Sequence, residues 1–132
     1  MTPEIVERVD AWIGARVPDG SDDPLVWLVS DWRKACALWR YRRAKDPEDA
    51  SGAVASAEAA MVGLLLALVR WAWDWNVWAQ SSFDSDIWLV MCPKLGPDRD
   101  GRPLIGSIDI EGHTEAEALV AALEAATRRE AS

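Results

Sequence analysis

A chain of 132 residues, 50% hydrophobic and 27% charged, is long enough to bury a core without disulfides or metals, which excludes a wholly disordered chain. Its formal net charge of −8 argues against generic nucleic-acid binding, because Lys and Arg contacts to phosphate supply most of that affinity. The acidity favours a basic protein partner instead. Two cysteines and an N-terminal stretch without an apolar leader indicate a reducing cytoplasm.

Three helices are expected in the first half of the chain, each opened by a capping residue followed by proline. The pairs are Thr2-Pro3, Asp23-Pro24 and Asp46-Pro47. Apolar residues at helical spacing extend the first helix over about 2–17 and the second over about 23–45, so an N-terminal helical pair over 2–45 is predicted. The third helix begins at Pro47 and holds the longest apolar run, 59–69, which is shorter than the roughly 20 residues of a membrane span. This run predicts a core helix and no membrane association.

The tryptophan-rich segment "RWAWDWNVWAQ", residues 70–80, allows two interpretations. Helical spacing continues from the third helix through Trp71, Trp75 and Trp78, which would make a helix of unusual length. Strict alternation of Trp71, Trp73 and Trp75 with small or polar residues is typical of a strand. We predict the strand, because Trp, Val and Asn form helices less readily than the Ala/Leu run before them. The stretch "SSFDSD" would then be a hairpin connection.

Two further strands and a helix are predicted in the remainder. Residues 87–92 are apolar on both faces, as in a central strand, and 103–112 alternate as in a strand with one solvated face. A capping box at Thr114 and Glu117 opens the last helix, whose inward residues are Leu119, Ala122, Leu123 and Ala126. The order α-α-α-β-β-β-α predicts a single α+β domain over 1–132, in which a three-stranded antiparallel meander is packed between helices.

The second half of this pattern resembles a known class of protein. Residues 47–130, a helix, a tryptophan-rich meander and a helix opening "GHTEAEALVAALEAA", resemble small phage-type helix-sheet-helix proteins, also described as ABA sandwiches. That class has no shared catalytic residues to carry over. The same order also resembles the double-stranded RNA-binding domain, but Glu115 and Glu117 stand where that family has phosphate-binding lysines. The departure argues against RNA binding in that mode.

Metal and cofactor binding are not predicted. His113 is the sole histidine, and Cys36 and Cys92 lie on separate predicted elements without the close spacing of zinc ligands. The cysteines are expected to be small core residues. We therefore predict no cofactor and no metal site.

Catalysis is not predicted either, and no residue is assigned a catalytic role. There is no Gly-x-Ser-x-Gly motif, and a histidine beside a helix cap more often serves the turn. Two carboxylate pairs exist, Asp84 with Asp86 and Asp109 with Glu111. Such pairs are usually solvated, and only burial would make one an acid–base pair. A small enzyme using paired carboxylates is the weakest of the alternatives.

A run of basic residues in the second predicted helix is the candidate basic patch. It spans thirteen residues without an acid and is interleaved with Trp39 and Tyr41. Its members are Arg33, Lys34, Arg40, Arg42, Arg43 and Lys45. A patch of this kind is typical of contacts to nucleic acid, lipid or acidic protein. The simpler interpretation is that cations near a helix C-terminus complement its dipole and stay solvated. A nucleic-acid-binding regulator using 33–45 is the alternative function.

Tryptophans of the predicted sheet form the candidate protein interface, since Trp is favoured in binding hot spots. They are Trp71, Trp73, Trp75, Trp78 and Trp88. In the competing interpretation the N-terminal helices cover this face, and a core forms with Trp12, Trp27, Trp32 and Trp39. The function predicted is a non-enzymatic acidic protein-binding module, such as a phage or mobile-element inhibitor, an anti-defence protein or a toxin-immunity protein. A protein partner and possible homodimer formation are expected.

Overall fold

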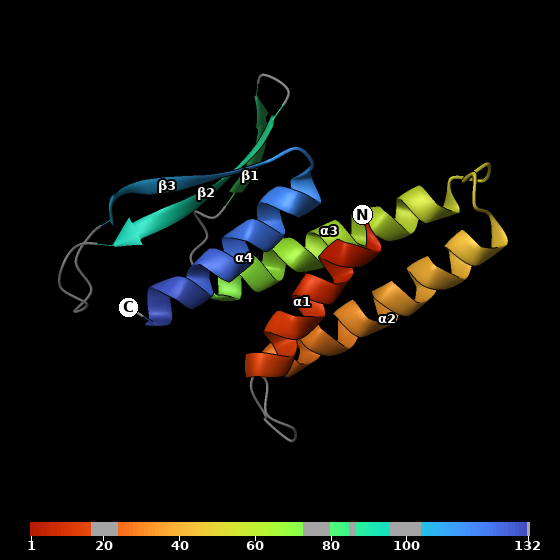
Figure 1. Ribbon diagram of the computed structural model, residues 1–132, viewed down its shortest axis with the longest axis horizontal. Coiled ribbons are helices and arrows are strands. Elements are labelled where there is room, and N and C mark those ends of the chain that lie inside the picture. The colour runs from red at the N-terminus through yellow and green to blue at the C-terminus, as the bar shows by residue number, and fades with distance from the viewer. Residues whose placement is uncertain (17–23, 73–79, 85–86, 96–103, 132) are drawn as a thin grey trace. The chain divides into compact units, whose positions relative to one another are not determined.

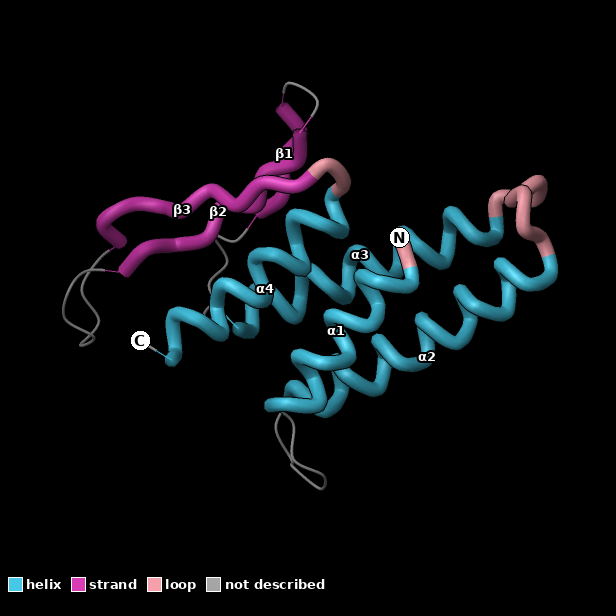
Figure 2. Tube along the Cα trace, in the orientation of Figure 1, coloured by secondary structure: helices cyan, strands magenta, loops and turns pink. Residues whose placement is uncertain are grey.

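A computed structural model of the chain describes residues 1–16, 24–72, 80–84, 87–95 and 104–131 (Figure 1). Along the chain lie α1 (Pro3–Arg16), α2 (Pro24–Lys45), α3 (Ala53–Ala72), β1 (Gln80–Asp84), β2 (Ile87–Leu95), β3 (Leu104–Gly112) and α4 (Glu115–Ala131). The chain divides into two compact units, Met1–Leu68 and Val69–Ser132. The first consists of helices, and the second combines the sheet with α4 (Figure 2).

The predicted fold class is wrong. The described chain is mostly helical, with four helices and one small sheet, and the predicted three-stranded meander packed between helices does not form as predicted. Residues 70–80 were to supply its first strand, but α3 continues through Trp71 to Ala72. The helix contacts of the sheet within its own unit come from α4, which packs against β1, β2 and β3. The single domain over 1–132 stays a prediction.

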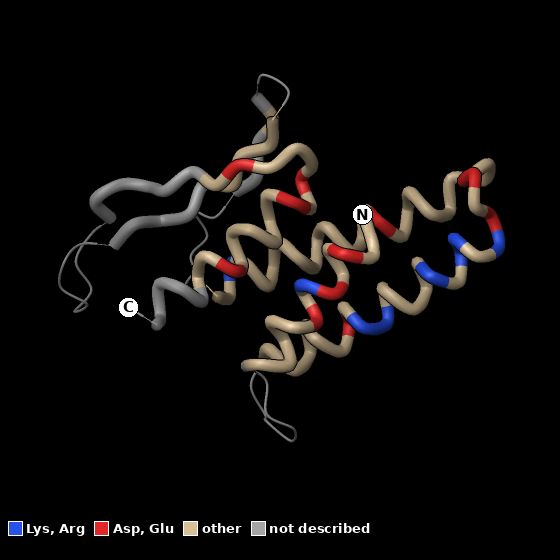
Figure 3. The backbone as a smooth tube through the Cα atoms, viewed as in Figure 1, with Lys and Arg blue, Asp and Glu red and all other residues tan. Residues whose placement is uncertain are grey.

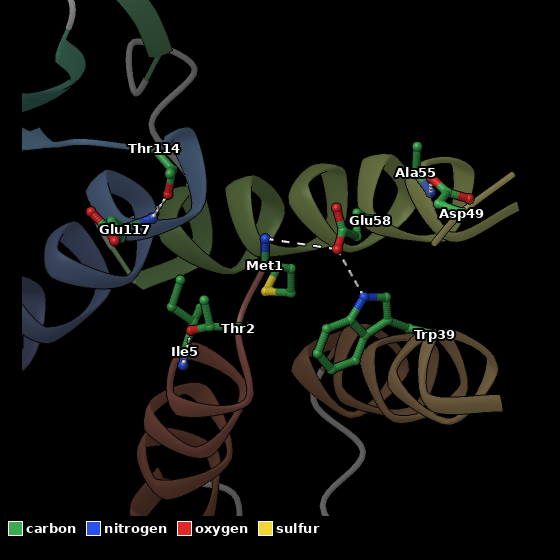
Figure 4. Close-up of polar contacts among 9 residues, drawn as sticks. All are labelled: Met1, Thr2, Ile5, Trp39, Asp49, Ala55, Glu58, Thr114 and Glu117. Atoms are coloured by element: carbon green, nitrogen blue, oxygen red, sulfur yellow. Dashed lines mark hydrogen bonds and ion pairs between the residues drawn. The ribbon is translucent and has the colours of Figure 1, made fainter. Parts of the chain in front are cut away.

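The first two helices begin where their capping residues predict. The Ile5 amide donates to the Thr2 hydroxyl at 3.3 Å, which caps α1 (Figure 4), and α2 begins at Pro24. Burial of large apolar side chains at helical spacing holds the first unit together. The fully buried ones include Val6, Val9, Ile13, Trp32, Trp39, Met61, Leu65 and Leu68.

The third helix begins at Ala53 and not at Pro47. The Asp46 carboxylate accepts hydrogen bonds from the amides of Ala50 and Ser51, so Asp46-Pro47 opens a turn instead of the helix. Asp49 then takes a left-handed backbone conformation with φ of 52°, and its carboxylate accepts from the amides of Val54 at 2.9 Å and of Ala55 at 3.1 Å. Asp49 thus satisfies amides that the first turn of α3 leaves without partners.

The apolar run of α3 keeps the chain helical as far as Ala72. Among the described helices, α3 has the length and apolar composition of a membrane span, a property that core helices of soluble proteins share. Within it, Glu58 binds Trp39 of α2 at 3.0 Å and the side chains of Met61, Leu65 and Leu68 are buried. This helix is compatible with a soluble protein.

The sheet of the second unit is antiparallel, in the order β1-β2-β3. Its first strand, β1, lies where the sequence predicted a hairpin connection, and it pairs Phe83 with Trp88 of β2. The last helix, α4, is capped as predicted, because the Glu117 amide donates to the Thr114 hydroxyl at 3.1 Å (Figure 4). Its four predicted inward residues, Leu119, Ala122, Leu123 and Ala126, are all buried.

Candidate protein-binding face on helix α2

Helix α2 buries one face in the first unit and fixes it with two indole hydrogen bonds. Trp32 Nε1 donates to Asp10 Oδ1 of α1 at 3.1 Å, and Trp39 Nε1 donates to Glu58 Oε1 of α3 at 3.0 Å (Figure 4). Both rings are fully buried, so these carboxylates supply acceptors that water cannot easily provide. Because the two acceptors lie on different helices, the orientation of α2 is fixed from both sides.

The opposite side of α2 carries three large hydrophobic side chains in solvent. Trp27 is 74% exposed, Tyr41 is 61% exposed and Leu38 is 44% exposed. Exposed charged residues complete the same row at spacings of three and four residues, which bring side chains to one face of a helix. The row, named the outer stripe, consists of Trp27, Asp31, Lys34, Leu38, Tyr41 and Lys45. Because large hydrophobic side chains on an exposed face can mark an interaction site, the outer stripe is a candidate contact surface.

The candidate basic patch shares Lys34 and Lys45 with the outer stripe. Arg42 Nη1 donates to the Ala53 carbonyl at 2.9 Å, and the Arg43 guanidinium lies 4.5 Å from the centroid of the Trp39 ring. Arg42 therefore joins α2 to the start of α3, whereas Arg43 contacts a ring of its own helix. Five residues of the patch are exposed: Arg33, Lys34, Arg40, Arg43 and Lys45. Figure 3 shows cations following the C-terminal half of α2.

One cation of the outer stripe contacts an aromatic member of the same row. Lys45 Nζ lies 5.7 Å from the centroid of the Tyr41 ring, within the range of a weak cation–π contact. Asp31 is the single acid of the outer stripe. The outer stripe thus combines cationic, anionic and hydrophobic groups on one exposed helix face.

The predicted tryptophan interface stays a prediction, because only two of its five residues lie in the described part of the chain. Trp71 lies half-buried in α3, whereas Trp88 lies in β2 with its ring centroid 5.4 Å from that of exposed Phe83. The other three candidates, Trp73, Trp75 and Trp78, fall outside the described residues. The alternative core prediction is wrong for Trp27, which is exposed, and right about the burial of Trp12, Trp32 and Trp39. Helical spacing from Trp27 to Tyr41 was the signal that could have revealed the outer stripe.

The residues considered for catalysis or metal binding lie on different elements of the chain. Within the described part of the chain, no group of three His, Cys, Asp or Glu side chains could hold a metal ion. Burial, with a smaller contribution from Asp10, raises the pKa of the Cys36 thiol to about 11. His113 is exposed, and its backbone amide donates to Glu117 Oε2 at 3.1 Å. Glu111 is exposed as well, whereas Asp86 and the side chains of Cys92, Asp84 and Asp109 lie outside what the structure describes.

A comparison with known proteins identified no relative of this chain. No protein family, curated protein or solved structure matches this chain.

Proposed function

We propose that the chain is a non-enzymatic protein-binding module that uses the outer stripe of α2 as its contact surface. The observation that supports this proposal is the exposure of Trp27, Leu38 and Tyr41 on one face of a helix whose opposite face is buried. Aromatic side chains supply large contact area at low conformational cost, and they dominate binding hot spots. The buried face of α2, fixed by the hydrogen bonds of Trp32 and Trp39, holds these exposed side chains in place.

A protein partner accounts for the outer stripe better than nucleic acid does. Asp31 lies within the row, and a phosphate backbone following α2 would meet its negative charge. Two of the six cations of the candidate basic patch, Arg42 and Arg43, already contact Ala53 and Trp39. The net charge of −8 opposes approach to nucleic acid further.

The setting proposed for this module is the cytoplasm, where an inhibitor or immunity protein of a phage or mobile element would act on a host or toxin protein. The support is small size, acidity and the scarcity of cysteine in the sequence.

The test is a pull-down with the immobilised wild-type chain and immobilised variants. Each is incubated with a lysate of host cells that also express the untagged chain, and the retained proteins are compared. The wild-type chain is expected to retain a protein at near-stoichiometric amount, and Trp27→Ala with Tyr41→Ala is expected to lose it. Phe83→Ala is the matched control, since Phe83 is also exposed, at 59%, but lies in β1 of the other unit. Equal retention by all three, or retention of nucleic acid alone, would overturn the proposal.

A further inference from the structure

The outer stripe has the spacing of a coiled-coil seam. Its residues follow one another at intervals of four, three, four, three and four positions, as the a and d positions of successive heptads do. Asp31, Leu38 and Lys45 take one of these positions, and the other three take the second. The stripe spans the 19 residues from Trp27 to Lys45, or about 27 Å of helix. Three of its six positions are charged, so these charges decide how a second helix can pair with the face.

The charges of the stripe distinguish between two orientations of an identical partner helix. In a parallel pair each residue meets its own copy, so Asp31, Lys34 and Lys45 would each face a like charge. In an antiparallel pair, an a position of one helix faces a d position of the other. In one register, every residue of the outer stripe faces another residue of the stripe in the second copy. Its three facing pairs are Trp27 with Lys45, Asp31 with Tyr41, and Lys34 with Leu38.

Each facing pair of this antiparallel register is chemically complementary. Lys45 can place its ammonium over the Trp27 ring of the second copy, as it already does over the nearer Tyr41 ring. The Tyr41 hydroxyl can donate to the Asp31 carboxylate of the second copy. The aliphatic stem of Lys34 can lie along Leu38 while its ammonium stays in water.

We infer that the outer stripe pairs with the same stripe of a second copy of this chain, in an antiparallel two-fold arrangement centred between Lys34 and Leu38. This inference rests on the proposed function, because it names the protein that occupies the proposed face. A two-fold contact closes on itself and yields a dimer rather than a filament. A single helix pair of this length buries an area at the low end for specific interfaces, about 1,200 Å² or less, so the dimer dissociates on dilution.

Cross-linking at two alanines beside the stripe tests the orientation. Ala37 and Ala44 are both exposed and lie one heptad apart on the same flank. In the antiparallel register Ala37 lies beside Ala37 of the second copy, whereas two Ala44 positions are about 24 Å apart along the helix axis. Under mild oxidation Ala37→Cys is expected to form a disulfide-linked dimer several-fold faster than Ala44→Cys. The wild-type chain sets the background from Cys36 and Cys92.

Sedimentation equilibrium across a wide concentration range tests association without any cross-link. The wild-type chain is expected to approach the dimer mass, and Trp27→Ala with Tyr41→Ala to remain a monomer. Asp31→Lys is expected to weaken association by about tenfold or more, because it adds a third cation to the seam. Glu48→Lys is its matched control, since it changes the net charge equally at an exposed position outside the stripe.

The outcomes separate this inference from the proposed function. Equal cross-linking of the two cysteine variants, or a wild-type chain that stays monomeric at every concentration, overturns the antiparallel dimer. If the immobilised chain then still retains a different protein that Trp27→Ala with Tyr41→Ala loses, the proposed function stands and the second copy is excluded. If nothing is retained, both fail. Circular dichroism of every variant excludes unfolding as the cause.

Discussion

Trp39 Nε1 lies 3.0 Å from Glu58 Oε1, and this hydrogen bond joins α2 to α3. The Trp39 side chain is 1% exposed, so its N–H has no easy access to water. Glu58→Ala removes the acceptor and is expected to lower the free energy of unfolding by about 1–3 kcal/mol. Glu58→Gln keeps an oxygen acceptor and is expected to lose less. Urea denaturation of the two variants measures the difference, and equal losses would show that the hydrogen bond contributes little.

The cap formed by Asp49 is expected to depend on its side-chain oxygens and on its left-handed backbone. Asp49→Ala removes the acceptors for the Val54 and Ala55 amides and places alanine at a φ of 52°. We expect a loss of about 1–2 kcal/mol in unfolding free energy. Asp49→Asn keeps an acceptor and tolerates this backbone conformation, so it is the matched control. A thermal melt of Asp49→Asn that matches that of Asp49→Ala would contradict this role.

Gly112 and Gly63 are expected to respond to alanine in opposite directions. A Cβ at Gly112 would meet the backbone of Ala118 in α4 well inside van der Waals distance, so Gly112→Ala is expected to cost about 1–3 kcal/mol. A Cβ at Gly63 meets nothing within 4 Å, and alanine there should stabilise α3 by about 1 kcal/mol. Denaturant titration measures both. A stable Gly112→Ala protein would mean that α4 can move away from β3 at little cost.

The Cys36 thiol is expected to resist alkylation in the folded protein. Its pKa is raised from 9.0 to about 11, which lowers the thiolate fraction near neutral pH about 100-fold. Because the folded state keeps the proton that the unfolded state loses above pH 9, stability is expected to fall as pH rises from 9 to 11. Iodoacetamide labelling of Cys92→Ser, with and without urea, measures the reactivity. Similar rates in both conditions would contradict burial of the thiol.

The low pKa of Asp46 makes stability depend on pH in the direction opposite to that of Cys36. The Ser51 and Ala50 amides and the Ser51 hydroxyl stabilise the carboxylate and hold its pKa below the ordinary 3.8. The contribution of this turn is therefore present above about pH 3.8 and is expected to be lost as pH falls further. Proton NMR of the Ser51 amide through an acid titration follows the turn directly. Asp46→Asn, which does not titrate, is the control.

The helix starts at Pro3 and Pro24 and the cap of α4 could be predicted from sequence, because a capping side chain acts on amides only a few residues away. The same reasoning gave the wrong start for α3. Asp46 has the residue type of a cap and precedes proline, but its carboxylate binds the Ala50 and Ser51 amides in a turn. Which amides a carboxylate captures depends on the path of the chain after it, and that path includes the left-handed Asp49.

The outer stripe and the end of α3 were harder to predict, for a different reason. Trp71 satisfies the spacing of a strand and of a helix, so local pattern could not decide its state. Trp27 looks like a core residue by composition, yet it is 74% exposed. Its exposure follows from which face of α2 meets α1 and α3, and the hydrogen bonds from Trp32 and Trp39 fix that face. Such long-range contacts leave no signature in a window of sequence.

The two faces of α2 can change independently of each other during evolution. Trp32 and Trp39 are tied to Asp10 and Glu58, so substitutions there alter the stability of the first unit. Trp27, Leu38 and Tyr41 expose much of their surface to solvent. Substitutions at exposed positions usually change the free energy of unfolding little. A lineage can therefore remodel the exposed row, residue by residue, while the helix that carries it stays in place.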